Sequence, residues 1–235
     1  MMRQMIIYNG RSNRNFGAVV SSKEEYNAPA PRISDFTVPG KNGKLHYADG
    51  TYDNFQKKYR IVVMNGDLAT KTKAIKAWLL SDSGYHRFED TYDTEVYRMA
   101  RVINSIEFSI FRNMASCDAE FDFKPASFLK SGENTVEFTK SGSILNPTSF
   151  AASPLIRIYG KGIVRIGNDE ITINRSGKKY IDIDTEISAA FEGIESRNGN
   201  ISRINKKIAL IPGENQIGLG TGITKIEIKP RWWTL

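Results

Sequence analysis

The sequence predicts a mainly β protein of two domains, the first of which carries a single α-helix. Three observations support this fold class. Short Ile-rich segments separated by turn residues fill the second half of the 235-residue chain, which is typical of an antiparallel β-sandwich. Residues 67–81 have the apolar spacing of a helix. The core-forming residue types also change: residues 1–130 contain 8 Ile and 17 Phe or Tyr, whereas residues 131–235 contain 19 Ile and 5 Phe or Tyr.

This change in composition predicts two domains, residues 1–130 and residues 131–235. The join is expected near residues 125–132, where Pro125, Ser131 and Gly132 interrupt the hydrophobic periodicity. At roughly 150 residues per domain, a chain of this length has room for one large domain or two small ones, and the composition favours two.

The helix of the first domain is expected over residues 67–81, with Asp67 or Thr70 as its N-cap. A β-strand is expected over residues 117–123, because apolar and acidic residues alternate there without a break. The predicted helix stripe consists of Leu68, Ile75, Trp78 and Leu79, and the predicted inward face of the strand consists of Cys117, Ala119, Phe121 and Phe123.

A projecting arm is expected between these elements, over residues 39–55. This segment is dense in turn-forming residues, which predicts one or more β-hairpins with polar tips. The arm is the candidate interaction site of the chain, and its candidate residues are Pro39, Gly40, Asn42, Gly43, Lys44, Tyr47, Asp49 and Gly50.

The second domain is expected to be built from strands over residues 154–158, 163–166, 171–173, 180–184, 208–211 and 225–229. A hairpin turn is expected at Gly167 and Asn168. Residues 187–192 are the exception, because their pattern favours a single helical turn.

Charge and composition exclude several classes of function. The net charge is +7, but Lys and Arg are spread along the chain without the dense cluster of a dedicated nucleic-acid site. One Cys and two His leave no material for an intramolecular disulfide or a cysteine zinc cage. Because no long apolar run occurs, neither a signal peptide nor a membrane span is expected, and we expect a soluble protein from a reducing compartment.

Two acidic groups are candidate cation sites. Asp118, Glu120 and Asp122 share one face of a predicted strand, but a solvated face balanced by Arg98 and Arg101 explains them better. The second group is Asp182, Asp184 and Glu186, which resembles the start of a calcium loop. It departs from that pattern because Ile187 and Gly193 stand where the loop requires Gly and Glu.

Motifs for catalysis are equally weak. The glycines at 218, 220 and 222 lack the spacing of a dinucleotide site. His86 lies near Glu89 and Asp90, and Cys117 has no spaced His partner. The residues therefore predict a binding or structural protein, with no catalytic residue, cofactor or metal.

Trp232 and Trp233 are adjacent in the final predicted strand, so their side chains point to opposite faces. One is expected to fill the core, with the other packed against another domain or subunit. The competing interpretation is a sugar-stacking platform.

Several ordered segments resemble the siphophage distal tail (Dit) proteins. The ending PGENQIGLGTGITKIEIKPRWWTL is similar to the family's C-terminus, which closes on a turn, a last strand and Arg-Trp-Trp. SPLIRIYGKG, YIDIDTEISAAFEG and FTVPGKNGKLHYADGTYDNF also resemble family segments, and the AWLL helix end precedes GY and DTY in the family's order. The resemblance covers nearly the whole chain, whose length suits the form without an inserted carbohydrate-binding module.

The resemblance implies an N-terminal β-sandwich-like domain with one helix and a protruding arm, followed by a C-terminal galectin-like antiparallel β-sandwich. It implies a structural virion protein, made in the bacterial host cytoplasm, that forms a homohexameric ring at the tip of a long non-contractile tail. The expected partners are further copies of the chain, the tail tube protein, and a tail-associated lysin or adhesion protein. DNA would only pass through the ring. The alternative is a host-surface carbohydrate-binding protein that uses the second domain, although that domain contains no His.

Overall fold

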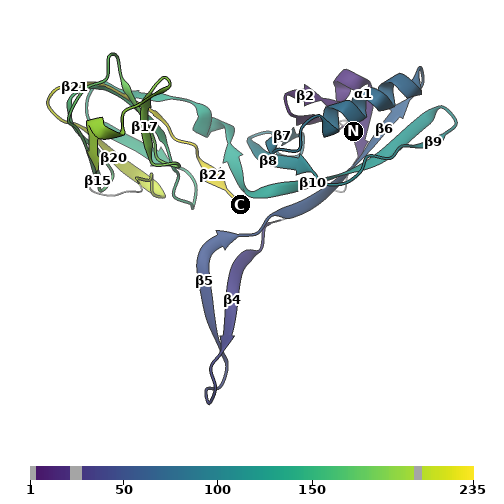
Figure 1. Ribbon diagram of the computed structural model, residues 1–235, viewed down its shortest axis with the longest axis horizontal. Helices are drawn as coiled ribbons and strands as arrows, with labels where there is room; N and C mark the ends of the chain where they lie inside the picture. Colours follow the sequence, from purple (N-terminus) through teal and green to yellow (C-terminus); the bar gives the residue numbers. More distant parts are fainter. Residues whose placement is uncertain (1–3, 22–27, 204–207) are drawn as a thin grey trace. The chain divides into compact units, whose positions relative to one another are not determined.

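The computed structural model describes residues 4–21, 28–203 and 208–235 of the chain. The chain divides into two compact units, Met1–Ser127 with Leu235 (unit 1) and Phe128–Thr234 (unit 2). Strands are the main elements of the described part of the chain, which contains one α-helix (Figure 1). The predicted mainly β fold with one α-helix is therefore confirmed.

Unit 1 is built on one sheet, in which seven strands run in the order β2-β1-β7-β8-β10-β6-β3. The long strand β10 also pairs with β9, and it runs antiparallel to both β6 and β9. A 3-10 helix, η1 (Asn13–Phe16), connects β2 to β3. The strands are β1 (Ile6–Tyr8), β2 (Arg11–Ser12), β3 (Ala18–Ser21), β6 (Phe55–Met64), β7 (His86–Asp90), β8 (Val96–Val102), β9 (Ser109–Phe111) and β10 (Met114–Leu129).

The helix α1 (Leu68–Leu80) packs on this sheet and closes the core of unit 1. Asp67 caps it by accepting a hydrogen bond from the Thr70 backbone N–H at 3.1 Å. Ile75, Trp78 and Leu79 are buried, and Trp78 Nε1 donates to the Tyr8 carbonyl at 2.8 Å. The predicted helix and its stripe are thus confirmed. Apart from the two strands of the arm, the strands of this unit belong to one sheet, and α1 packs on it.

Strand β10 follows the alternation predicted for residues 117–123. Cys117, Ala119, Phe121 and Phe123 are all buried in the core of unit 1. Burial raises the pKa of the Cys117 thiol to about 12, so this thiol is protonated near neutral pH. Asp122 departs from the prediction, because it is only 7% exposed although its neighbours Asp118 and Glu120 are not buried.

Unit 2 is a sandwich of two sheets around an Ile-rich core. One sheet has six strands in the order β11-β21-β13-β16-β17-β18, and the other has five in the order β12-β20-β14-β15-β19. The first sheet comprises β11 (Val136–Phe138), β13 (Leu155–Gly160), β16 (Ile181–Asp184), β17 (Ala189–Glu192), β18 (Glu195–Ser196) and β21 (Ile223–Lys229). The second comprises β12 (Gly142–Asn146), β14 (Gly162–Ile166), β15 (Asp169–Ile173), β19 (Ile201–Arg203) and β20 (Gly213–Leu219).

Shorter elements complete unit 2. They are the 3-10 helices η2 (Lys130–Glu133) and η3 (Asn198–Asn200) and the terminal strand β22 (Trp233–Thr234). The predicted hairpin turn is confirmed, since Ile166 pairs with Asp169 and Gly167 adopts φ 57° between them. A left-handed φ suits glycine, which has no Cβ to clash.

The helical turn predicted over residues 187–192 is wrong. Ala189–Glu192 is strand β17, which pairs antiparallel with β16. Ser188 takes a left-handed φ of 55° and turns the chain back toward β16. As a result Ala190 lies opposite Ile183 and only 1% of it is exposed. Burial of this short side chain outweighs a local helical preference in so short a segment.

Candidate functional site

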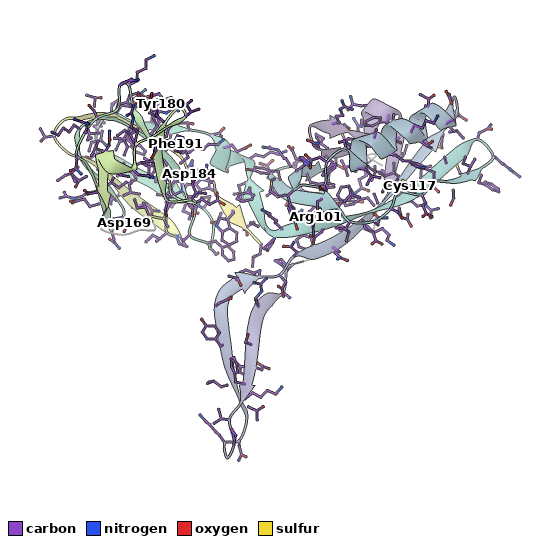
Figure 2. All side chains as sticks on the ribbon, in the orientation of Figure 1. Arg101, Cys117, Asp169, Tyr180, Asp184 and Phe191 are labelled. Carbon is purple, nitrogen blue, oxygen red and sulfur yellow. The ribbon has the colours of Figure 1, made fainter. Side chains whose placement is uncertain are left out.

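The predicted arm is a two-stranded antiparallel sheet that pairs with no other described strand (Figure 1). Its strands are β4 (Pro31–Thr37) and β5 (Lys44–Tyr52). Every residue of β4 is exposed, and so is every residue of β5 except Tyr52. The side chains of the arm extend into open space on both sides (Figure 2). No core holds this hairpin, so its faces are free to contact another molecule.

The bounds of the arm differ from the predicted residues 39–55. The hairpin begins at Pro31, and Phe55 already belongs to β6 in the main sheet. Prediction from the sequence missed β4 because an exposed strand has no buried face to impose alternating hydrophobicity. The turn residues were informative: the tip lies between Thr37 and Lys44, with Gly40 and Gly43 at φ 77° and 85°.

One face of the arm is apolar. Phe36 pairs with Leu45 and Ser34 pairs with Tyr47, so these four side chains lie on the same side of the two-stranded sheet. The exposed fractions are 53% for Phe36, 57% for Leu45 and 62% for Tyr47. We call Phe36, Leu45 and Tyr47 the arm face. Grouped exposed apolar side chains of this kind mark interaction surfaces.

The opposite face of the arm is charged, and its charges neutralise one another. Asp35 pairs with His46 across the strands, and His46 Nδ1 lies 2.5 Å from the Asp35 carboxylate. Lys44 Nζ lies 3.8 Å from the same carboxylate. These exposed pairs contribute little stability, since solvent screens them. Burial against another molecule would therefore stabilise the apolar arm face more than this charged face.

Polar contacts fix the base of the arm to the sheet of unit 1. Arg32 forms an ion pair with Asp53 at 2.8 Å, and the Asp53 N–H donates to the Ala30 carbonyl at 2.9 Å. The next residue, Asn54, donates to the buried carboxylate of Asp122 at 3.1 Å. This carboxylate also accepts from Tyr85 and Arg101, at 2.5 Å and 3.2 Å. These contacts explain why Asp122 is buried. Its partners lie on other elements, so the alternation within β10 could not predict them.

The acidic candidates are balanced by neighbouring cations. Glu120 forms an ion pair with Lys58 at 2.7 Å, and Asp122 forms one with Arg101. In unit 2, Asp182 forms a two-point ion pair with Arg157 at 2.7 and 2.9 Å. Across residues 4–21, 28–203 and 208–235, no group of three or more His, Cys, Asp or Glu side chains is arranged to hold a metal ion.

His86 is not brought together with the two carboxylates that follow it. Its Nε2 lies 3.5 Å from Asp82. Glu89 instead accepts a hydrogen bond from Arg87 at 2.6 Å, and Asp90 accepts one from the Tyr59 hydroxyl at 2.9 Å. His86 therefore does not pair with Glu89 or Asp90, the two carboxylates near it in the sequence.

The two C-terminal tryptophans lie in unequal environments. Trp232 is 5% exposed and belongs to the core of unit 2. Trp233 packs on Phe150, with ring centroids 4.4 Å apart, and its Nε1 donates to the Ala151 carbonyl at 3.0 Å. Because Trp232 is buried, its ring presents no open face on which a sugar could stack.

No described helix has the length and apolar character needed to cross a bilayer.

Comparison of the whole structure with known proteins gives a full-length match. No family model and no curated protein matches the sequence. Among solved structures, the Dit protein of phage SPP1 superimposes with a TM-score of 0.71 over 100% of both chains, at 10% sequence identity. The chain has the Dit fold. The SPP1 protein is described as a paradigm of the hub adsorption apparatus in phages that infect Gram-positive bacteria.

The Dit fold agrees with the resemblance seen in the sequence. At 10% identity the superposition establishes the fold alone. The arm, the ion pairs and the cores are features of this chain and are not inferred from the SPP1 protein.

Proposed function

We propose that this chain is a structural protein of a phage tail tip, where copies join into a ring that connects the tail tube to the adhesion apparatus. The observation that carries the proposal is the full-length agreement with a hub protein, combined with an exposed arm that has an apolar face. The ring is homohexameric in the form that we propose, with a channel left open for DNA. The tail tube protein and a tail-associated lysin or adhesion protein are its neighbours in the virion.

The arm is the element that joins the copies. Closed rings of identical subunits use heterologous contacts, in which one surface of each copy meets a different surface of the next. A hairpin without a core of its own can cover a neighbour without weakening the unit that carries it. The arm residues proposed from the sequence, which lie between Pro39 and Gly50, belong to its tip and to β5. The arm face shares Tyr47 with that set and adds Phe36 from β4 and Leu45 from β5.

The apolar surface of the arm face would contribute to the stability of each contact between copies. Full burial of a large apolar side chain contributes about 1.5–3 kcal/mol. The three side chains of the arm face are a little over half exposed in the free chain. Covering them therefore stabilises each contact by about 3–5 kcal/mol, which corresponds to a change of roughly 10²–10⁴-fold in the association constant.

Substitution of the arm face tests this role. We expect the triple variant Phe36→Ser, Leu45→Ser, Tyr47→Ser to remain folded and to lose the ring, because these side chains contribute to contacts between copies and not to the core. Light scattering on the purified full-length protein gives the assembly mass. A matched control is Leu145→Ser, Ile194→Ser, Ile211→Ser, which removes three exposed apolar side chains from unit 2. Rings that persist in the arm variant would contradict the proposed role.

A further inference from the structure

A second group of exposed apolar side chains lies at one end of the sheet of unit 1. Met114 pairs with Met64 of β6 and with Phe111 of β9, so these three side chains lie in one row on the same face. They are 42%, 42% and 66% exposed for Met64, Met114 and Phe111. We call Met64, Phe111 and Met114 the sheet patch.

The sheet patch faces away from the core. The next residue after Met114 is Ala115, which is fully buried, and side chains alternate along a strand. The next row of side chains on this face contains Val62 and its partner Val19, which are both half-buried and extend the apolar surface. With strands about 4.8 Å apart, the row across β9, β10 and β6 is about 10 Å wide, enough to receive a two-stranded hairpin.

Polar side chains further along this face form contacts with one another. Further along β6 and β10, Lys58 pairs with Glu120 at 2.7 Å, and Arg60 donates to the Ser116 hydroxyl at 3.3 Å. The apolar row is therefore the part of the face that gains most from being covered.

The arm and the sheet patch lie at opposite ends of the same strand. The arm joins β6 at Phe55, and the patch includes Met64, the last residue of β6. A ten-residue strand at about 3.3 Å per residue places the base of the arm about 30 Å from the patch. Two complementary surfaces at opposite ends of one rigid strand are what a head-to-tail contact between copies requires.

Within unit 1, few other exposed apolar side chains compete for this role. In the described part of unit 1, five large apolar side chains of this kind lie on the arm and four lie in β6, β9 and β10, and only two lie elsewhere. Those on the arm are Ile33, Phe36, Val38, Leu45 and Tyr47; those at the sheet end are Met64, Ile110, Phe111 and Met114; the others are Leu80 and Ile103.

We propose that the sheet patch is the docking surface for the arm face of a second copy of this chain. The inference rests on the proposed function, because it identifies the surface that the arm covers in the neighbouring subunit. Each copy then offers its arm to one neighbour and its sheet patch to the other.

A mixing experiment tests this pairing directly. The arm variant is Phe36→Ser, Leu45→Ser, Tyr47→Ser, and the patch variant is Met64→Ser, Phe111→Ser, Met114→Ser, each in the full-length chain. We expect each variant alone to sediment as a monomer. An equimolar mixture should form dimers and stop there, since only one intact arm and one intact patch are available. The unit 2 control, Leu145→Ser, Ile194→Ser, Ile211→Ser, should assemble like the unmodified chain.

The possible outcomes separate the inference from the proposed function. A patch variant that forms rings by itself would overturn the inference and leave the arm's role intact. A mixture of folded variants that stays monomeric would also overturn it. Assembly of the arm variant, or an unmodified chain that is monomeric at every concentration, would contradict the proposed function as well. Circular dichroism checks folding, and Phe111→Ser alone replaces the triple patch variant if that variant unfolds.

Discussion

Gly132 lies where two segments of unit 2 approach more closely than any side chain allows. A Cβ added at this position would be 2.3 Å from the Trp232 backbone nitrogen and 3.2 Å from the Arg231 carbonyl carbon. The Gly132 carbonyl also accepts a hydrogen bond from the Arg231 N–H at 2.8 Å. Because the nearest atom belongs to the backbone, it cannot move aside as the end of a flexible side chain would. The glycine is therefore required by the packing of the chain's C-terminal segment.

Gly132→Ala tests this close approach. We expect the substitution to lower the free energy of unfolding by about 1–3 kcal/mol, the usual cost of forcing extra volume into a packed site. The matched control is Gly199→Ala, whose added Cβ meets nothing within 4 Å and which has no positive φ. The control should stay within about 0.5 kcal/mol of the unmodified chain. Urea unfolding of both variants measures the difference, and equal stabilities would show that the site relaxes freely.

Residue-level prediction succeeded where a side chain's role follows from its neighbours in sequence. Trp78 and Cys117 are buried as their helical and strand positions predict. For Gly132 the sequence predicted only a break in the periodicity. Its close contact with Trp232 could not be predicted, because it joins residues 100 positions apart. Asp122 was placed on the solvent side for the same reason: Asn54, Tyr85 and Arg101 approach it from other elements.

At the scale of elements, Glu192 ties the segment before β16 to the β17–β18 hairpin. Its carboxylate accepts the backbone N–H groups of Lys178 and Lys179, at 3.0 and 2.7 Å. Arg197 also donates to it, at 2.8 and 3.2 Å. The two backbone hydrogen bonds, followed by those from Arg197, lower the pKa of Glu192 from 4.5 to about 2. The ionised carboxylate is therefore the form that holds these segments together.

This pKa shift predicts a pH-dependent stability. Since the folded state binds its proton more weakly than the unfolded state, the contribution of Glu192 is fully present above pH 4.5 and is lost as the pH falls toward about 2. We expect Glu192→Gln to be less stable than the unmodified chain at pH 7, with the gap narrowing through that window. Urea unfolding across the pH series measures the gap.

A control and a contradicting result complete this test. Glu214→Gln changes an exposed carboxylate of β20 and should stay within about 0.5 kcal/mol of the unmodified chain at pH 7. A gap for Glu192→Gln that is unchanged between pH 7 and pH 2 would show that the carboxylate's charge does not hold the two segments.

Elements with a buried face were predicted more accurately than elements without one. Helix α1 and the strands of unit 2 can be recognised in the sequence because burial imposes a period of 3.6 or 2 on their apolar residues. Strand β4 has no buried residue, so the arm could be recognised only from the turn-forming residues of its tip and of β5. The arm face and the sheet patch were missed because each arises from the register between strands, which pairs Phe36 with Leu45 and Met114 with Phe111.

At the scale of the whole molecule, each unit has its own core and its own chemistry. Tyr8, Tyr59, Phe88, Phe121 and Phe123 form an aromatic cluster in unit 1, with several ring centroids 5–6.5 Å apart. Unit 2 is filled mainly by isoleucine. In the described part of unit 1, most exposed large apolar side chains lie on the arm and at one end of the sheet. This distribution favours a protein that acts by joining copies of itself.

The location of the chain in the virion tests the central claim most directly. Gold-labelled antibodies raised against the purified chain can be applied to intact phage particles and viewed by electron microscopy. The account predicts label at the free end of the tail, where the tube meets the adhesion apparatus, and nowhere else on the particle. Label along the tube or on the capsid, or particles that carry none, would contradict it.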